Sequence, residues 1–474
     1  MKVAIIGAGP RGLWAAEELI DRAGQRGAAI ELTVFNETPM EEISAPGAFG
    51  ASVPEQWILN APKSIVETHL GPLDPNDELE GQFPPRRRVG EHLDASWEAL
   101  RTNLPAKCTL DFRITRVQDV TPVGNGVEVD GEQFDEVLMV TGHAHDWPGS
   151  LAHQDLGDLR VIAPAYPASN LDSVTSDDIA LVRGAALTFI DVVRYAKAKA
   201  FYPVTRSGRF MEVKAYLDEE QSRAAQPIIE KADRAILQCQ SLEELKEILT
   251  ESAEAILTIV GGEGACEDIQ AVINGEDFTG DPVAELRTSV AAAKGERPWT
   301  PALAVALAFR DTEDALIQRA SFGGRDSLGG SEFDDFMSTL GRVATGPPVE
   351  SAVEMLALID DNRIRTDVFN RGEDDLTEVA KEVGATVVID AVNAPAGVVD
   401  GTLIGDLVER GVGMRYADTS ALHIHPDGTL VGQKHLAAAG RMNEGLVLGH
   451  DTLRRDKQNI IYRWAERVSA RAAE

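Results

Sequence analysis

Three glycines near the amino terminus form the pattern with the clearest chemical meaning. Gly7, Gly9 and Gly12 stand in the segment VAIIGAGPRG, which follows a short apolar run and precedes a segment of helical periodicity. In this context the first glycine permits a tight turn, the second lets the backbone approach a diphosphate, and the third lets the helix pack closely on the strand. The helix amino terminus also attracts negative charge. The pattern therefore predicts a dinucleotide site, to which Pro10 and Arg11 of the same turn would contribute.

A carboxylate follows the second strand of the same unit. Residues 2–6 and 30–35 read as buried strands, so that the glycine turn and its helix complete a β-α-β unit of a parallel sheet. Glu37 comes soon after the second strand, where a carboxylate accepts hydrogen bonds from the ribose hydroxyls of a dinucleotide. We therefore expect Glu37 at the sugar. The alternative is an ordinary β-α-β turn whose glycines serve packing alone.

A second strand–turn–helix pattern surrounds Gly184. A strand over 179–182 and a helix over 187–198 flank this glycine, and alanines occupy the next two positions. The incomplete glycine pattern predicts a looser approach to phosphate. Beyond the next strand, Arg206 and Arg209 stand where a cation would bind the 2′-phosphate of NADPH. A solvated basic turn explains the same arginines equally well, so both interpretations stay open.

The carboxyl-terminal segment GLVLGHDTL contains a third candidate. Residues 446–448 read as an apolar strand that ends at Gly449, and Asp451 stands at a predicted strand-to-helix junction. At such a junction a carboxylate can accept a hydrogen bond from a polyol hydroxyl, while the helix amino terminus faces a negative group. The simpler alternative is that Asp451 caps the helix, and the two roles are compatible.

The rest of the chain supplies elements around these motifs. In order along the sequence we expect loops over 40–105, an antiparallel hairpin over 109–120 and 126–134, a buried strand over 136–141, helices over 217–358, a strand over 385–391 and a helix over 460–470. Strands that alternate with helices indicate an α/β fold with parallel sheets.

The composition excludes several classes of protein. The 474 residues are 43% hydrophobic and 26% charged, which excludes a disordered chain. With 45 Lys and Arg against 77 Asp and Glu the formal charge is −32, which disfavours nucleic-acid and anionic membrane partners. Cys108, Cys239 and Cys266 form no C-x-x-C pair, so we expect neither a metal site nor a dithiol redox centre. The absence of a membrane-length apolar run and of a signal peptide predicts a cytoplasmic protein.

Several segments, in order, resemble those of a known family. They are VAIIGAGPRGL, QWILNAP, PPRRRVGEHL, EVLMVTGH, VRGAALTFID followed by TRSGRF, RVATGPPVESAVEMLALI and GRMNEGLVLGHDTLRR. With these segments the chain resembles the FAD-NAD(P)-binding family of bacterial flavoproteins, which are similar to N-hydroxylating and Baeyer–Villiger monooxygenases. The resemblance is weakest between about 215 and 335, and the Baeyer–Villiger pattern F-x-G-x-x-x-H-x-x-x-W is absent.

The resemblance implies two cofactors. FAD would be held by the first glycine turn, by Glu37 and by the segment of Asp451, and NAD(P)H would bind near Gly184. Thr141 and Gly142 match the family's strand-to-crossover motif, where the chain passes between two nucleotide-binding domains.

The implied fold is α/β, with two Rossmann-like dinucleotide-binding domains and a helical insertion. Its expected parts are the first part of the FAD-binding domain over 1–150, the first part of the NAD(P)-binding domain over 151–215, the helical insertion over 216–360, and the returning strands with the carboxyl-terminal part of the FAD-binding domain over 361–474.

Several polar side chains between the first glycine turn and Gly184 have a functional and a structural interpretation. Asn60 could hydrogen-bond a flavin ring or a nicotinamide, and the three arginines at 86–88 could hold an acidic substrate. A turn asparagine and a solvated basic loop are the alternatives. Four histidines could transfer a proton or serve the structure alone: His69, His92, His143 and His145. No side chain is assigned as a catalytic acid or base.

These observations predict an FAD-dependent, NAD(P)H-using oxidoreductase, and more narrowly a monooxygenase that acts on a small molecule. Without a cysteine pair to relay electrons, molecular oxygen or a small acceptor is the simplest outlet. Two other functions stay open: an NAD(P)H-dependent flavin reductase or dehydrogenase, and a non-catalytic dinucleotide-binding sensor. Homo-oligomers are compatible with the sequence.

Overall fold

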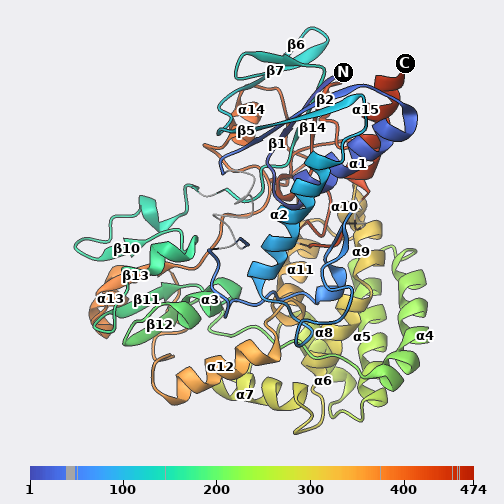
Figure 1. The fold of residues 1–474 in the computed structure, drawn as a ribbon. Coiled ribbons are helices and arrows are strands. Elements are labelled where there is room, and N and C mark those ends of the chain that lie inside the picture. Colours follow the sequence, from blue (N-terminus) through green and yellow to red (C-terminus); the bar gives the residue numbers. More distant parts are fainter. Residues whose placement is uncertain are drawn as a thin grey trace. The chain divides into compact units, whose positions relative to one another are not determined.

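The computed structural model describes residues 1–38, 49–50, 52–144, 146–373, 375–450, 452–455, 457 and 459–474. The chain divides into two compact units (Figure 1), and each unit combines segments that are far apart in sequence. Unit 1 comprises Met1–Ser150, Tyr166–Ala168 and Asn393–Glu474. Unit 2 comprises Leu151–Ala165 and Ser169–Val392.

Unit 1 is built on a sheet that, in the described residues, has five parallel strands in the order β14-β9-β1-β2-β5. The strands are β1 (Lys2–Ile6), β2 (Ile30–Asn36), β5 (Cys108–Ile114), β9 (Glu136–Met139) and β14 (Leu436–Ala438). At the carboxyl end of β1, Ile6 is paired with Phe35 on one side and with Met139 on the other. Parallel strands are buried on both faces and read as continuous apolar runs, which explains why the first strand and the strand before Thr141 are recognisable in the sequence.

Two helices from opposite ends of the chain cover this sheet together. Helix α1 (Pro10–Arg26) and helix α15 (Ile460–Ala473) lie side by side in Figure 1. Arg22 and Arg26 of α1 both pair with Glu466 of α15. Because α15 packs on α1, the carboxyl-terminal segment is fixed close to the helix that begins at the glycine turn.

Helix α2 (Arg86–Thr102) lies in the region where we expected loops. Val89, Leu93 and Trp97 recur every four residues and are buried, which is a helical spacing that the surrounding Pro and Gly residues obscured. The expectation of loops throughout 40–105 is therefore wrong for α2. The short elements of the same region are the 3-10 helix Lys63–Ile65, β3 (Glu67–Thr68) and β4 (Gly71–Pro72).

The expected hairpin over 109–120 and 126–134 is divided between two sheets. Its first half is β5, which runs parallel to β2 at the edge of the main sheet. The antiparallel part is a separate small sheet made of β6 (Val120–Val123), β7 (Gly126–Val129) and β8 (Glu132–Phe134). Alternation in the sequence identified the strands, but the partner of β5 lies far earlier in the chain and left no local signal.

Unit 2 contains a second parallel sheet, which in the described residues has the order β10-β13-β11-β12. The strands are β10 (Arg160–Ile162), β11 (Ile179–Arg183), β12 (Ala200–Val204) and β13 (Val387–Asp390). Helix α3 (Leu187–Tyr195) joins β11 to β12. The strand and helix expected on either side of Gly184 are confirmed, although the helix ends earlier than expected.

Helices fill unit 2 between β12 and β13, which confirms the helical expectation over 217–358 (Figure 1). They are α4 (Glu219–Ile236), α5 (Leu242–Ile259), α6 (Cys266–Asn274), α7 (Pro282–Ala293), α8 (Pro301–Asp311), α9 (Glu313–Ala320), α10 (Gly324–Ser327), α11 (Ser331–Ala344) and α12 (Val349–Asp360), and α13 (Leu376–Val383) leads into β13. The remaining helices are α14 (Leu403–Glu409) in unit 1 and the 3-10 turns Leu151–His153, Ala168–Leu171 and Arg441–Asn443.

We expected residues 361–474 to hold the returning strands and the carboxyl-terminal part of the FAD-binding domain, and the structure divides this range between the two units. Residues 361–392 belong to unit 2, because β13 pairs with β10 and β11, and only residues 393–474 return to unit 1. Two parallel sheets, each with its own helices, confirm the expected α/β fold with two Rossmann-like units and a helical insertion. Among the described residues, no helix is both long and apolar enough to span a membrane.

Candidate dinucleotide sites

The three glycines of the first turn have different surroundings. A Cβ atom at Gly7, where φ is +107°, would lie 2.4 Å from the carbonyl oxygen of Val140, and one at Gly12 would lie 2.1 Å from the carbonyl oxygen of Gly7. A Cβ atom at Gly9 would have no described atom within 4 Å. Gly7 and Gly12 are therefore required by the packing of the protein itself, whereas Gly9 leaves its backbone accessible to a ligand.

The turn presents the amino terminus of α1. Gly9 is the N-cap residue, no described side chain caps the helix, and the first turn contains no acidic residue. Pro10, at the first helical position, has no N–H group that would need a partner. Because the first turn of α1 itself carries no carboxylate, the positive end of the helix dipole favours an anion at this place.

Side chains from other elements hold the turn in place. The indole Nε1 of Trp97, on α2, donates to the carbonyl oxygen of Ala8 at 3.0 Å. The backbone N–H of Ala8 donates to Oδ1 of Asn36 at 3.2 Å, and that of Gly7 donates to the carbonyl oxygen of Phe35 at 2.8 Å. Trp97 and Asn36 were missed from the sequence. Asn36 was adjacent to an identified residue, but nothing in the sequence linked Trp97 to the glycines.

The residues after β2 and β9 lie at the same edge of the sheet as the turn, because the strands are parallel. Glu37 is exposed there, and its carboxylate forms an ion pair with Arg116 at 3.5 Å. Thr141 and Gly142 are exposed, and the Cα atom of Thr141 would lie 3.3 Å from a Cβ atom on Gly7. The structure thus brings these three residues to the glycine turn, and their roles in binding stay predictions.

The carboxyl-terminal segment also reaches the turn. Nη2 of Arg11 donates to the carbonyl oxygen of His450 at 2.7 Å, which places Gly449 near the start of α1. The strand expected over 446–448 is wrong, because these residues are buried in turns and the sheet has no strand beside them among the described residues. The helix expected after this strand begins only at the start of α15. Asp451 lies outside the described residues.

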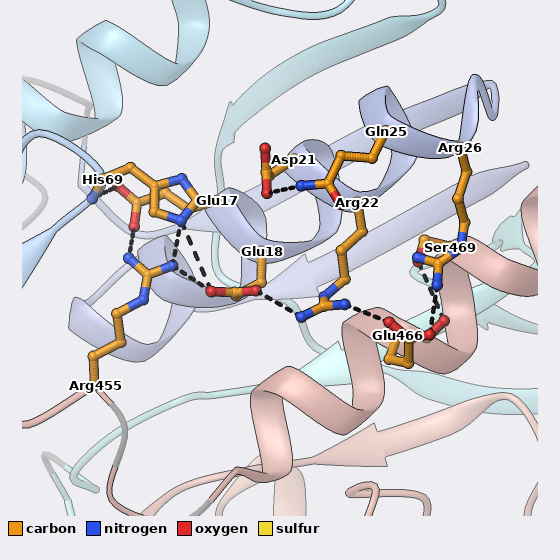
Figure 2. A network of polar contacts seen from close by, with 10 residues as sticks. All are labelled: Glu17, Glu18, Asp21, Arg22, Gln25, Arg26, His69, Arg455, Glu466 and Ser469. Carbon is orange, nitrogen blue, oxygen red and sulfur yellow. Dashed lines mark hydrogen bonds and ion pairs between the residues drawn. The ribbon is translucent and has the colours of Figure 1, made fainter.

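A network of charged side chains then fastens the chain to α1 (Figure 2). Arg455 donates to Glu17 and, at 2.8 Å, to Glu18, and its Nη2 lies 2.7 Å from Nε2 of His69. Burial raises the pKa of Glu17, whereas the contacts with His69 and Arg455 lower the pKa of Glu18 to about 2. Along α1 the network continues from Glu18 through Arg22 to α15. His69 therefore has a structural role in this network.

The other polar residues named from the sequence are placed around α2. Residues 86–88 open this helix instead of a loop: the first arginine is buried and lies 3.4 Å from the hydroxyl of Tyr166, and the next two pair with Glu91. These arginines therefore do not form the expected basic loop: they begin a helix, and their side chains already contact other residues of the protein. Asn60 is half-buried just after the bridge between Ile58 and Pro85, and its role stays a prediction.

Of the other histidines, His92 contacts other residues of the protein through its ring. Its Nε2 lies 3.2 Å from Oγ1 of Thr68 and 3.2 Å from the carbonyl oxygen of Gly71, and burial lowers its pKa. His143 is exposed. His145 lies outside the described residues.

The turn in unit 2 repeats the turn in unit 1. The backbone N–H of Gly184 donates to the carbonyl oxygen of Val204 at 2.9 Å, as that of Gly7 does to Phe35 at 2.8 Å. Gly184 has a φ of +96°, and in both units the helix begins three residues after this glycine. The two turns can therefore be compared position by position.

The comparison shows why the second glycine pattern is incomplete. Ala186 takes the position of Gly9 and is exposed, so this turn carries a methyl group where the first turn has none. Phe189 takes the position of Gly12 and is fully buried in the core of unit 2. We expect a diphosphate to approach this turn less closely than the first one, and this stays a prediction.

The charge after the second strand is opposite in the two units. Arg206 follows Val204 by two positions, as Glu37 follows Phe35. The side chain of Arg206 is 90% exposed and has a long contact of 3.9 Å with Glu373. Arg209, the other candidate, is instead buried in ion pairs with acidic residues of the helical insertion, so it is not available to a nucleotide.

A buried ion pair joins the carboxyl ends of β11 and β13, the two central strands of the sheet in unit 2. Arg183 binds Asp390 through two bonds of 2.9 and 2.8 Å, and both side chains are almost fully buried. Asp390 also accepts the backbone N–H of Leu151 at 2.9 Å. Such a bidentate pair fixes the geometry of the strand ends, next to the turn that carries Gly184.

A hollow of about 450 Å³ in unit 2 does not coincide with this turn. It is lined by the end of α3 and by Lys199, which precedes β12, whereas Arg206 follows the same strand. The hollow therefore lies at the opposite edge of the sheet. In the described part of the chain, no group of three or more His, Cys, Asp or Glu side chains could hold a metal ion.

A family model matches the part of unit 1 that contains the first turn. Residues 4–144 match the model of the FAD-NAD(P)-binding family. The amino-terminal part of the chain is therefore similar to an FAD-NAD(P)-binding domain. No curated protein sequence matches the chain.

Solved structures of oxygenating enzymes are similar to this chain at low identity. The ornithine N-hydroxylase of Kutzneria sp. 744 is 11% identical, with a TM-score of 0.48 over 98% of this chain and 99% of that one. The ornithine hydroxylase of Pseudomonas aeruginosa is 11% identical, with a TM-score of 0.47 over 100% and 98%. The S-allyl-L-cysteine S-oxygenase of Allium sativum is 20% identical, with a TM-score of 0.30 over 46% of this chain and about half, 53%, of that enzyme.

Proposed function

We propose that the protein is a flavin-dependent monooxygenase that binds FAD at the turn of unit 1 and NADPH at the turn of unit 2, and that acts on a small molecule. The observation that supports this most directly is that units 1 and 2 contain the same kind of glycine turn. The strand that follows each turn is succeeded by an acidic residue in unit 1 and by a basic residue in unit 2. Glu37 would accept hydrogen bonds from the ribose hydroxyls of FAD, and Arg206 would bind the 2′-phosphate of NADPH.

The residues of unit 1 fit a dinucleotide of this kind. Gly9 is open where a diphosphate approaches, and the first turn of α1 has no acidic residue that would repel it. Arg11 is fixed in the first turn of this helix by its bond to the carboxyl-terminal segment. These groups would hold and orient the cofactor, which when bound would supply the redox chemistry by accepting a hydride and passing electrons to molecular oxygen.

The arrangement of the cysteines favours oxygen as the electron acceptor over a dithiol relay. Cys108, Cys239 and Cys266 are free thiols; the first lies in unit 1 and the other two in unit 2. Burial raises the pKa of Cys108 and of Cys239, which makes both thiols less reactive. We therefore expect molecular oxygen or a small acceptor, and not a disulfide substrate, to take the electrons.

The purified protein provides the test. We expect a yellow protein whose flavin absorbance bleaches when NADPH is added without oxygen, and which consumes oxygen when air is admitted. Bleaching that persists in air until another acceptor is supplied would show a reductase instead. A colourless protein that gains no thermal stability from added FAD would refute the proposal.

The nucleotide assignment is tested with Arg206→Ala. Removing a charge-assisted contact to the 2′-phosphate is expected to weaken NADPH binding about 10- to 100-fold, from about 1.5–3 kcal/mol, and to leave NADH unaffected. Arg223→Ala, which removes an exposed arginine of α4, is the matched control and should change neither affinity. Equal losses for NADPH and NADH in Arg206→Ala would remove this residue from the site.

A further inference from the structure

Arg206 lies in a short turn that a buried hydrogen bond closes. The hydroxyl oxygen of Thr205, a buried residue, accepts the backbone N–H of Gly208 at 2.8 Å. Gly208 has a φ of +62°, which glycine adopts without strain. The backbone N–H of Thr205 donates to the carbonyl oxygen of Phe369 at 3.0 Å. The start of the turn is therefore fixed to the segment that follows α12, while the side chain of Arg206 points into solvent, 90% exposed.

Arg209 holds the other end of this turn. Its guanidinium donates to both carboxylate oxygens of Asp277, at 2.7 and 2.8 Å, and to Glu285 at 3.1 Å. Asp277 lies between α6 and α7, and Glu285 lies in the first turn of α7, so both acceptors belong to the helical insertion. A bidentate pair fixes the guanidinium in direction as well as in distance. The insertion therefore anchors the chain three residues after Arg206.

The charge of Arg209 is balanced within its own cluster. Arg342 of α11 lies 3.6 Å from Asp277, and Glu212 interacts electrostatically with both arginines. Among the described residues, two arginines thus face three acidic residues: Asp277, Glu285 and Glu212. Because these carboxyl groups at least balance the positive charge, any effect of Arg209 on a nucleotide passes through the position of the turn.

We propose that Arg209 is a positioning residue for the NADPH site, and that the helical insertion sets the preference for NADPH over NADH by anchoring Arg209 through Asp277 and Glu285. This inference rests on the proposed role of Arg206 at the 2′-phosphate. Anchored at both ends, the turn holds the Cα–Cβ bond of Arg206 in one direction. Without the anchor it samples several directions, and the affinity for the 2′-phosphate falls by the fraction of molecules that keep the competent one.

The test measures the dissociation constants of NADP⁺ and NAD⁺ by isothermal titration calorimetry on the flavin-loaded protein, because the oxidised nucleotides bind without transferring a hydride. Asp277→Asn weakens the anchor and keeps its shape. If about one third to one tenth of the molecules then keep Arg206 in place, NADP⁺ affinity falls about three- to tenfold. NAD⁺, which has no 2′-phosphate, should bind as before.

The sign of the change separates positioning from electrostatics. Asp277→Asn makes this region less negative, so a purely electrostatic effect would strengthen the binding of NADP⁺. Positioning predicts weaker binding instead. In the Arg206→Ala background, Asp277→Asn should cause no further loss of NADP⁺ affinity, because the side chain that the anchor positions is already missing.

The matched control is Asp334→Asn, which disturbs another bidentate pair of the helical insertion, the one with the buried Arg325. It should lower the melting temperature and leave both affinities unchanged. Glu285→Gln, which alters only the contact of 3.1 Å to Arg209, is a milder second variant in case Asp277→Asn does not fold. It should weaken NADP⁺ binding about two- to threefold and leave NAD⁺ binding unchanged.

Unchanged or tighter NADP⁺ binding in the folded Asp277→Asn variant would overturn the inference. Equal losses for NADP⁺ and NAD⁺, or a further loss in the Arg206→Ala background, would overturn it as well. Unchanged NADP⁺ affinity in Arg206→Ala alone would instead refute the proposed nucleotide site, so the two failures are distinguishable.

Discussion

Replacing single glycines of the first turn should separate the demands of the fold from those of the ligand. At Gly9, which has φ −60° and ψ −172°, alanine is conformationally allowed and its methyl group would meet no described atom within 4 Å. Reduced freedom of the unfolded chain favours this alanine by about 0.4–1 kcal/mol, while the poor N-cap propensity of alanine costs a similar amount. We therefore expect Gly9→Ala to change the free energy of unfolding by less than about 0.5 kcal/mol.

At Gly12 the same substitution should lower the stability of the fold. The new methyl group would lie 2.1 Å from the carbonyl oxygen of Gly7, so the helix or the turn must move, and overpacking of this kind costs about 1–3 kcal/mol. The higher helix propensity of alanine returns about 1 kcal/mol. The net expectation for Gly12→Ala is a loss of up to about 2 kcal/mol in the free energy of unfolding.

Gly9→Ala should weaken FAD binding even though it hardly changes stability. Its methyl group would occupy the space through which a diphosphate reaches the backbone, and loss of a hydrogen bond to a charged group costs about 1.5–3 kcal/mol, or about 10- to 100-fold in FAD affinity. Fluorescence titration with FAD and urea denaturation without ligand measure the two quantities separately. Gly341→Ala in α11, where a Cβ atom also has no described neighbour within 4 Å, should leave FAD affinity unchanged. Undiminished FAD affinity in Gly9→Ala would refute this account of the turn.

Two further substitutions test the supports of the site. Glu18→Gln should lower stability at neutral pH, because the carboxylate has its pKa lowered from 4.5 to about 2 in the folded protein. This shift stabilises the fold above pH 4.5 by roughly 3 kcal/mol, and the contribution is lost as the pH falls toward 2. Urea denaturation across this pH range should therefore show a weaker acid dependence in the variant than in the unmodified protein. Glu17, whose raised pKa acts in the opposite direction, is present in both proteins. An unchanged pH profile would contradict the network. Trp97→Phe should leave the carbonyl oxygen of Ala8 unpaired, cost about 1–3 kcal/mol of stability and weaken FAD binding several-fold. Full retention of both quantities would show that α2 does not support the turn.

Local sequence determined the turns and the elements that flank them. The glycine spacing, the apolar run before it and the helical periodicity after it all lie within one β-α-β unit, so the positions of Gly7, Gly9 and Gly12 follow from short-range rules. The same holds for the strand and helix around Gly184. Even the opposite charges of Glu37 and Arg206 were evident in the sequence, because each follows its own strand closely.

Tertiary structure alone decided what surrounds these turns. Trp97 reaches Ala8 from a helix hidden in a region rich in Pro and Gly, and His450 reaches Arg11 from the far end of the chain. The pairing of β5 with β2 was equally invisible. Such contacts join residues that are separated by dozens to hundreds of positions, and they form because parallel strands need long crossovers and because helices bury their apolar faces wherever a partner surface exists. Sequence periodicity records which face of an element is buried, but it does not record the element against which that face packs.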